Sequence, residues 1–447
     1  MRSAVSFAPI RRVLLAQMAE RQARFESERV QRFPDSWARY VGAEFAQRAR
    51  GDLPAANRWL DAYADAAQGR LPLAASDDEI CDAARAAAHD GWHLIAGLRA
   101  VPAVVGALAQ HCAAHGIAPA GVRKDCPQAA IARMLDPVWW LRRMRRAHAK
   151  RVEGAAIDAA LVHRGGWLYA SDDTVKRRAE QRERNRRAVA GAVLESDAGE
   201  VLDLQAAVDA STANPEVKNA EFMVRMRGLE EVAKREGHAA EFWTLTAPSS
   251  FHRMRQDEAG RVEPNPKWSG ATPRQAQVYL CKVWARIRAA WARRGVQVYG
   301  FRVAEPHHDG CPHWHMLLFM PPEQCEMARE VFRLHALRLD GDEPGAEQHR
   351  VAFKSIDPER GSAAGYIAKY LAKNISGAFV GDDEEAAPGV SARDTVARCD
   401  AWAAAWGIRQ FQQIGAAPVG VWRELRRMAE GVLNPLIERL RMAADLS

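Results

Sequence analysis

The stretch from residue 296 to residue 320 constrains the fold most, because it holds two strand-like runs separated by a short loop. The run VQVYGFRVAE (296–305) and the run HWHMLLFM (313–320) are rich in β-branched, aromatic and other apolar residues. Between them lies PHHDGCP, whose proline and glycine residues are typical of a turn. The sequence therefore predicts a hairpin of two adjacent antiparallel strands.

The segments around this hairpin extend it to a larger unit. A strand is expected at FWTLTAP (242–248) and another at HRVAFKSID (349–357), and helices are expected over 273–294, 323–339 and 362–375. The order of elements is then β-α-β-β-α-β-α, and its first six elements match a ferredoxin-like unit. The predicted fold class is α+β, with a central ferredoxin-like antiparallel sheet, a helical N-terminal region and a small helical C-terminal tail.

The remaining sequence predicts how the chain is divided. Residues 1–200 are rich in alanine, arginine and leucine and read as a series of helices interrupted by prolines. Residues 201–380 contain the predicted sheet, and residues 381–447 begin with an acidic linker and continue as a helical tail. We therefore expect three regions with boundaries near residues 200 and 380.

Composition bounds the class of protein. The chain has 447 residues, and lysine plus arginine exceed aspartate plus glutamate by 63 to 56, which permits a polyanionic partner without requiring one. The seven cysteines contain no C-x-x-C pair, so neither a disulfide framework nor a zinc ribbon is indicated. No apolar stretch approaches the roughly 20 residues of a membrane span. We expect a cytoplasmic protein with no membrane partner.

One basic stretch stands out in the N-terminal region. The run LRRMRRAHAKR (141–151) has six basic residues and no acidic one. A solvated helix face would explain it as well as contact with phosphate would. We consider Arg142, Arg143, Arg145 and Arg146 candidate DNA-binding residues.

The sharpest chemical feature is the pair His313 and His315. Residues two apart on a strand point to the same face, so both imidazoles project together. If the two hairpin strands pair across the seven-residue loop, Glu305 lies opposite His313 and adds a carboxylate to that face. Two imidazoles and one carboxylate suit Mg²⁺ or Mn²⁺ used as a Lewis acid. His307 and His308, in the loop, are competing ligands.

A second feature is the pair Tyr366 and Tyr370 on the predicted helix over 362–375. The spacing of four places both rings on one helix face, with Cβ atoms roughly 5–6 Å apart. Lys369 and Lys373 interleave with the tyrosines and give the helix a cationic edge suited to a phosphate backbone. A phenol, with a pKa of about 10, needs electrophilic assistance to attack a phosphate at neutral pH, and a nearby metal would supply it.

Taken in order, these motifs resemble the replication gene A endonucleases of tailed bacteriophages, which belong to the HUH superfamily of rolling-circle initiators. The resemblance is carried by YGFRVAEPHHDGCPHWHMLLF (299–319), with TLTAPSSFH (244–252) before it and GYIAKYLAKNI (365–375) after it. It extends outward through segments 211–233, 266–280 and 406–428 and covers about 200 to 430.

The resemblance implies a role for each matching residue. His313 and His315 correspond to the metal-binding histidines, Glu305 to a third ligand, and Tyr366 and Tyr370 to paired catalytic tyrosines. Such enzymes cut one strand at a replication origin, form a 5′-phosphotyrosine and leave a 3′-hydroxyl that primes polymerase. The implied partners are single-stranded DNA at an origin and, in the bacterial host cell, a replicative helicase and a polymerase.

Other functions remain open at this level. An HUH relaxase or transposase would share the metal site and the tyrosine. A hydrolytic metallonuclease would use a metal-bound water and leave no covalent adduct. A DNA-binding phage protein with an inactive site would bind an origin without nicking it.

Overall fold

A computed structural model describes residues 8–68, 71–123, 125–257, 259–357, 359, 361–366, 391–431 and 434–446. The chain forms two compact units, Met1–Leu161 and Val162–Ser447. The region boundary predicted near residue 200 therefore falls inside the second unit, and the boundary predicted near residue 380 lies outside the described residues.

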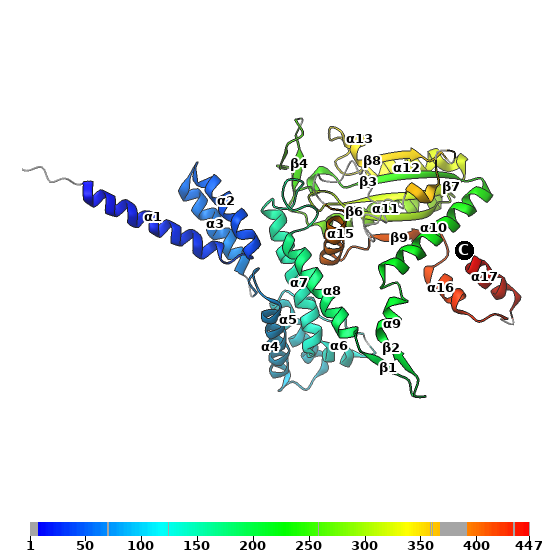
Figure 1. Ribbon diagram of the computed structural model, residues 1–447, viewed down its shortest axis with the longest axis horizontal. Helices are drawn as coiled ribbons and strands as arrows, with labels where there is room; N and C mark the ends of the chain where they lie inside the picture. Colours follow the sequence, from blue (N-terminus) through cyan, green and yellow to red (C-terminus); the bar gives the residue numbers. More distant parts are fainter. Residues whose placement is uncertain are drawn as a thin grey trace, which may run out of the picture. The chain divides into compact units, whose positions relative to one another are not determined.

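The first unit is helical, as the sequence predicts. Proline marks where several of its helices begin, because a residue at the first turn needs no intrahelical N–H partner. Pro102 and Pro137 occupy such positions, and Ser76 and Glu79 form a reciprocal capping box at the start of α4. The helices are α1 (Ala8–Val30), α2 (Asp35–Ala49), α3 (Leu53–Gln68), α4 (Asp77–Ile95), α5 (Val101–Ala114), α6 (Pro127–Met134) and α7 (Pro137–Asp158) (Figure 1).

The second unit begins with helices and a small hairpin. The first of these helices falls in the region predicted to be helical, whereas the hairpin was not predicted. These elements are α8 (Asp172–Val189), β1 (Val193–Glu195), β2 (Val201–Asp203), α9 (Leu204–Asp209) and α10 (Pro215–Glu236). Gly237 ends α10 in the left-handed conformation, φ 68°, and the chain turns directly into the first strand of the main sheet.

A five-stranded antiparallel sheet forms the centre of the second unit. Its strands lie in the order β8-β3-β7-β6-β9, and every neighbouring pair is antiparallel. The four predicted strands are present, and β9 is an additional edge strand supplied by a segment after residue 391. The strands are β3 (Ala239–Thr246), β6 (Tyr299–Pro306), β7 (Pro312–Met320), β8 (Val351–Ser355) and β9 (Phe411–Ile414).

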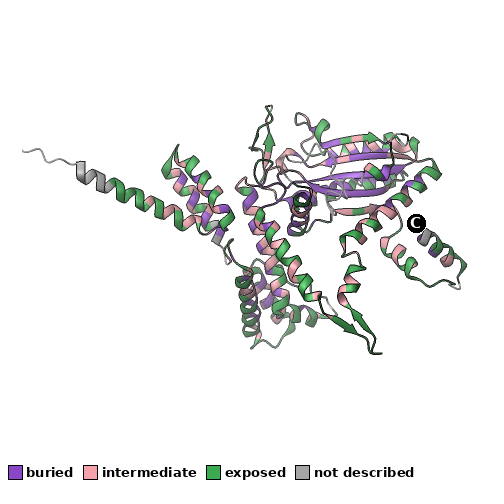
Figure 2. Ribbon diagram, in the orientation of Figure 1, coloured by how far each residue is buried: buried purple, intermediate pink, exposed green. Residues whose placement is uncertain are grey.

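Helices cover both faces of this sheet, and β7 is buried at all nine positions although it carries two histidines (Figure 2). On one face, α10 packs through Met226 and Ala233 against a cluster that contains Leu317 and Phe319. On the other face lie α11 (Pro273–Arg293) and α12 (Cys325–Ala336), and the indole of Trp314 donates to Gln277 of α11 at 2.9 Å. The two faces of β7 therefore have different partners.

The fourth strand begins later than predicted. A strand was expected from residue 349, but α13 (Ala346–Arg350) continues through Arg350. The buried guanidinium of Arg350 donates to the carbonyl oxygens of Ala336 and Leu339, at 2.6 and 2.7 Å. These bonds to an earlier segment fix Arg350 at the end of α13, and the strand begins only at the next residue. Local sequence propensity does not reveal such contacts.

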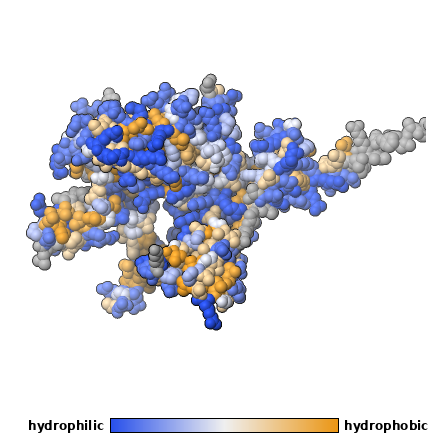
Figure 3. All heavy atoms as spheres, turned by 180° about the vertical axis from the view of Figure 1, so that it is seen from behind, coloured by the Kyte–Doolittle hydropathy of each residue, from blue (hydrophilic) through white to orange (hydrophobic). Residues whose placement is uncertain are grey.

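The remaining elements are not part of the main sheet. A two-stranded ladder of β4 (Met254–Gln256) and β5 (Val262–Pro264) follows β3, and the short 3₁₀ turns η1 (Ser249–Phe251) and η2 (Pro322–Gln324) follow β3 and β7. The last helices are α15 (Ala392–Trp406), α16 (Val419–Arg427) and α17 (Pro435–Leu446). Exposed apolar residues gather over α16 and α17, among them Val421, Leu436, Leu440 and Met442 (Figure 3). Among the described helices, none combines the length and the apolar character that crossing a bilayer requires.

Candidate metal centre

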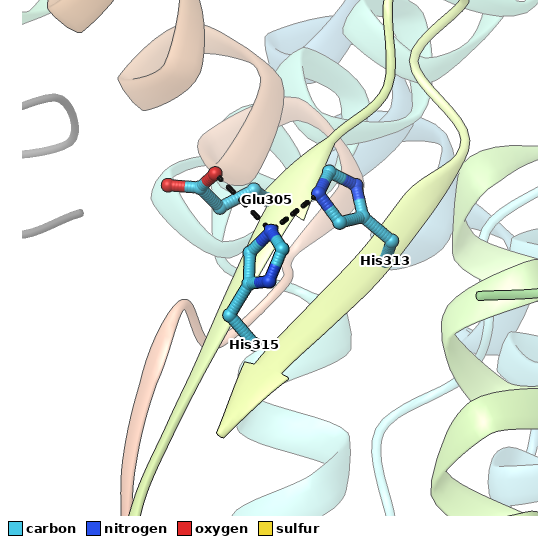
Figure 4. Close-up of side chains that lie close together, drawn as sticks. All are labelled: Glu305, His313 and His315. Atoms are coloured by element: carbon cyan, nitrogen blue, oxygen red, sulfur yellow. Dashed lines mark hydrogen bonds and ion pairs between the residues drawn. The ribbon is translucent and has the colours of Figure 1, made fainter. Parts of the chain in front are cut away.

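Glu305, His313 and His315 converge on one face of the sheet (Figure 4). Glu305 of β6 lies directly opposite His313 of β7, so the pairing expected from the loop length is present. The Nε2 atoms of the two histidines are 2.8 Å apart, and His315 Nε2 lies 3.9 Å from Glu305 Oε2. One ligand atom from each residue falls within 4.8 Å of the others, which is close enough for all three to contact one ion.

The burial of these groups fits a cation better than it fits a simple ion pair. Glu305 is fully buried and each histidine is only 5 % exposed. Burying a carboxylate costs several kcal/mol unless opposite charge compensates it. Two imidazole nitrogens and a carboxylate oxygen on rigid paired strands form a donor set that divalent ions of the Mn²⁺ and Mg²⁺ type accept.

Thr244 orients one of the histidines. It pairs with His315 across the β3–β7 ladder, and its Oγ1 lies 3.1 Å from His315 Nδ1. When Nδ1 carries the ring proton and donates it to Thr244, Nε2 keeps a lone pair that points toward His313 and Glu305. The sequence analysis did not identify Thr244. The alternation in FWTLTAP predicts which face of its strand Thr244 occupies. The sequence does not show that this strand pairs with β7, so the contact with His315 could not be predicted.

The β6–β7 loop is held by hydrogen bonds to the buried carboxylate of Asp309, not by the three residues of the metal centre. Asp309 accepts hydrogen bonds from the backbone N–H of Cys311 at 3.0 Å and from His252 Nδ1 at 3.2 Å. Burial would raise the pKa of Asp309, but His252 and His307 hold it at about 2. Burial and the neighbouring His252 lower the pKa of His307 to about 3, so His307 is neutral at pH 7.

Neither loop histidine belongs to the group of three. The ring of His307 packs against that of His313 with centroids 4.0 Å apart, and the ring of His308 stacks on Tyr169. The indole of Trp402, on α15, donates to the carbonyl oxygen of Gly310 at 2.8 Å. The loop is therefore fixed by segments that lie far away in the sequence.

Tyr366 lies on the same face as the histidines. Residues 363–366 are helical, and the half-buried ring of Tyr366 packs on Phe242, which itself stacks on His315 with centroids 5.4 Å apart. The ammonium group of Lys354, on β8, lies 5.0 Å from the centre of the Tyr366 ring. Lys354 is a cation beside the tyrosine that the sequence analysis missed.

Glu230 anchors the start of this helical segment. Its carboxylate, on the sheet-facing side of α10, accepts the backbone N–H groups of Ala363 and Ala364 at 3.2 Å each. Lys234 pairs with the same carboxylate at 3.1 Å. A negative group at a helix N-terminus satisfies N–H donors that have no intrahelical partner and complements the helix dipole. Glu230 therefore ties residues 363–366 to α10.

The other predicted site residues are placed as follows. Tyr370, Lys369 and Lys373 lie outside the described residues. In the first unit, Arg145 forms a two-pronged ion pair with Asp77, at 2.6 and 2.8 Å, so its guanidinium already has a protein partner. Arg142, Arg143 and Arg146 are exposed on α7, and Arg143 lies over the ring of Trp139.

The fold and the site define a mixed α+β protein with a carboxylate–histidine centre on an antiparallel sheet. The family model described as bacteriophage replication gene A protein matches residues 99–378. The chain therefore belongs to the family of bacteriophage replication gene A proteins.

Individual relatives agree with this assignment. The chain is 44 % identical over 304 residues to the replication gene A protein of Escherichia phage 186, covering 67 % of this chain and 43 % of that protein. It is 41 % identical over 330 residues to the probable replication protein P12 of Pseudoalteromonas phage PM2, covering 72 % and 50 %. It is 36 % identical over 301 residues to a probable replication endonuclease from a prophage-like region of Salmonella typhi, covering 67 % and 37 %.

The chain thus spans half or less of the length of each of these relatives. No solved structure is significantly similar to it.

Proposed function

We propose that this chain is a metal-dependent DNA endonuclease that initiates rolling-circle replication of a phage or prophage genome in a bacterial host cell. The observation that carries the proposal is the convergence of Glu305, His313 and His315 on the sheet face against which Tyr366 packs. The order β8-β3-β7-β6 of the four predicted strands supports a ferredoxin-like HUH unit, because it is the order 4-1-3-2 in terms of the sequence.

Each residue of the site has a separate role in the proposed reaction. Glu305, His313 and His315 would hold a divalent ion, Mg²⁺ or Mn²⁺, which when bound polarises a phosphate oxygen and neutralises developing charge. The hydroxyl group of Tyr366 or Tyr370 gives up its proton, and its oxygen attacks the phosphorus atom of one strand. The bond from phosphorus to the 3′-oxygen breaks, and that oxygen takes up a proton.

The products are a tyrosine linked to the 5′-phosphate and a free 3′-hydroxyl that a polymerase can extend. A second tyrosine permits a second transesterification, which rejoins the strand. Lys354, Lys369 and Lys373 supply positive charge for the phosphate backbone of the single strand, and exposed Arg142, Arg143 and Arg146 supply it in the first unit. A host helicase and polymerase would act on the opened strand.

The test is capture of the covalent product. The full chain is incubated with Mn²⁺ and a library of randomised single-stranded oligonucleotides that carry a fluorophore at the 3′ end. We expect fluorescence to remain on the denatured protein and peptide mapping to place the nucleotide on Tyr366 or Tyr370. EDTA and the His313→Ala variant should abolish the adduct, and the double variant Tyr366→Phe/Tyr370→Phe should form none.

The outcomes separate the competing functions. Cleaved oligonucleotide without adduct would identify hydrolysis by a metal-bound water and refute the tyrosine mechanism. An adduct that persists in the double variant would place the nucleophile elsewhere. Sequencing of the captured strands shows where they were cut. Cleavage at one origin-like sequence supports a replication initiator, whereas cleavage at element ends or a transfer site would indicate a transposase or a relaxase.

A further inference from the structure

The side of the sheet that α11 and α12 cover, opposite the metal centre, carries a group of cations that the proposed nuclease chemistry does not use. Lys282, Arg286, Arg293 and Arg294 lie on or directly after α11, and Arg338 follows α12. All five are exposed. We call this group the α11 basic face.

The spacing on α11 makes a stripe. Lys282, Arg286 and Arg293 are separated by four and seven residues, so they project within about 40° of one another on a helix of 3.6 residues per turn. At 1.5 Å per residue the stripe is about 16 Å long. The buried residues of α11, such as Leu280 and Ile287, lie on the other side of the helix, so the stripe is directed to solvent.

The charges of four of these arginines act on a nearby histidine. Burial and the charges of Arg286, Arg338, Arg293 and Arg294 together lower the pKa of His335, which lies among them. None of the five side chains of the face forms an ion pair with a residue in the described part of the chain. Like charges at helical spacing repel and destabilise the helix slightly. An external polyanion would remove that repulsion.

The chemistry of the face identifies the polyanion. Proteins that bind single-stranded DNA combine positive charge with exposed aromatic rings on which bases stack. Here no aromatic ring of α11 or α12 is exposed, since Trp284 is 7 %, Trp291 3 % and Phe332 0 % exposed. The half-buried ring of Tyr279 packs against Phe251, with centroids 4.9 Å apart. A duplex presents its backbone at higher charge density, about one charge per 1.7 Å of axis, and needs no stacking platform.

We propose that the α11 basic face binds the phosphate backbone of double-stranded DNA, on the side of the sheet that does not carry the metal centre. The proposal rests on the proposed function only for the choice of DNA as the polyanion. It gives the protein two DNA contacts with different tasks. The histidine face takes the single strand to be cut, and the α11 face holds a duplex without reading its sequence.

The test compares two sets of four substitutions that remove the same charge. The first is Arg286→Gln/Arg293→Gln/Arg294→Gln/Arg338→Gln. The control set, Arg24→Gln/Arg85→Gln/Arg123→Gln/Arg235→Gln, takes exposed arginines that each pair with a neighbouring acid. Binding of the full chain to a 30-base-pair duplex, to a single-stranded 30-mer and to poly-glutamate is measured in EDTA at several salt concentrations.

We expect the first set to weaken duplex binding at least tenfold near 0.15 M salt. The slope of log affinity against log salt should become less negative by about 3–4, since each lost phosphate contact removes about 0.9. Single-strand binding should change less than threefold, and the control set should change the duplex slope by less than about 1. If the combined variant does not fold, Arg286→Gln and Arg293→Gln should each reduce the slope by about 0.9.

The proposal is overturned if the duplex slope is unchanged, if the control set has the same effect, or if single-strand binding falls equally. Tighter capture of poly-glutamate than of duplex would also overturn it, in favour of an acidic protein partner. Because binding is measured in EDTA, failure of the strand-cutting mechanism would not alter these outcomes.

Discussion

Replacing Glu305 with glutamine tests whether the buried carboxylate belongs to a metal centre. The side chain is fully buried and its Oε2 lies 3.9 Å from His315 Nε2. Glutamine keeps the size and shape but removes the charge. In EDTA, we expect the variant to be no less stable than the wild type, because the substitution removes the cost of burying a charge.

The magnitude of the effect follows from linkage between ion binding and stability. Mn²⁺ at 100 times its dissociation constant stabilises the folded state by about 2.7 kcal/mol. For a unit of this size each kcal/mol corresponds to roughly 2–4 °C, so the wild type should gain about 5–10 °C. Loss of a partner behind a metal ligand already weakens affinity by about 10–100-fold. If loss of the Glu305 ligand weakens Mn²⁺ affinity about 100-fold, the same Mn²⁺ concentration would raise the Tm of the variant by only about 1–2 °C.

Scanning calorimetry with and without Mn²⁺ measures both quantities. Glu231→Gln is a matched control, because Glu231 is an exposed carboxylate on α10 and should leave the Mn²⁺ response intact. An equal rise in Tm for the wild type and for Glu305→Gln would refute the assignment of this carboxylate as a ligand. A fall in Tm of Glu305→Gln in EDTA would show instead that Glu305 serves as a structural ion-pair partner.

Three further changes address the surroundings of the site. Thr244→Val should lower Mn²⁺ affinity about 10–100-fold in calorimetric titration, because the hydroxyl beside His315 Nδ1 is lost; unaltered affinity would contradict this role. Glu230→Ala leaves two buried N–H groups without their acceptor, so it should cost about 1–3 kcal/mol and speed amide exchange at residues 363–366, whereas Glu231→Ala should do neither. Asp309 has its pKa lowered to about 2 by His252 and His307 against the effect of burial, so its stabilisation is present above the ordinary pKa of 3.8 and is lost as the pH falls through about 2. Urea unfolding should therefore show a weaker acid dependence for Asp309→Asn than for the wild type, and parallel curves would exclude the linkage.

Local patterns in the sequence were enough to predict the strands of the site and much of its geometry. The alternation in HWHMLLFM places His313 and His315 on one face, because successive side chains of a strand point to opposite sides. The seven-residue loop then brings Glu305 opposite His313, which the observed strand pairing confirms. The identity of the metal and the roles of Tyr366 and Tyr370 stay predictions.

Contacts between distant segments were not accessible to the same reasoning. The fifth strand, β9, comes from beyond residue 391, and its pairing with β6 has no local signature. Arg145 looked available for DNA in the sequence, but it pairs with Asp77, which lies 68 residues away. Glu230 reads as an ordinary helix-surface glutamate until the fold turns it toward the sheet.

The sequence by itself determined which side chains share a face, because that depends only on the two-residue period of a strand and the 3.6-residue period of a helix. It therefore placed His313 and His315 on one face, and the strand pairing expected from the loop added Glu305 to them. The same helical period puts Lys282, Arg286 and Arg293 on one side of α11, which the sequence analysis did not note. The tertiary structure decided what lies against each face. Only packing brought Tyr366 onto Phe242 beside the histidines and left the arginines of α11 facing solvent, because burial and pairing depend on segments that are far apart in the chain.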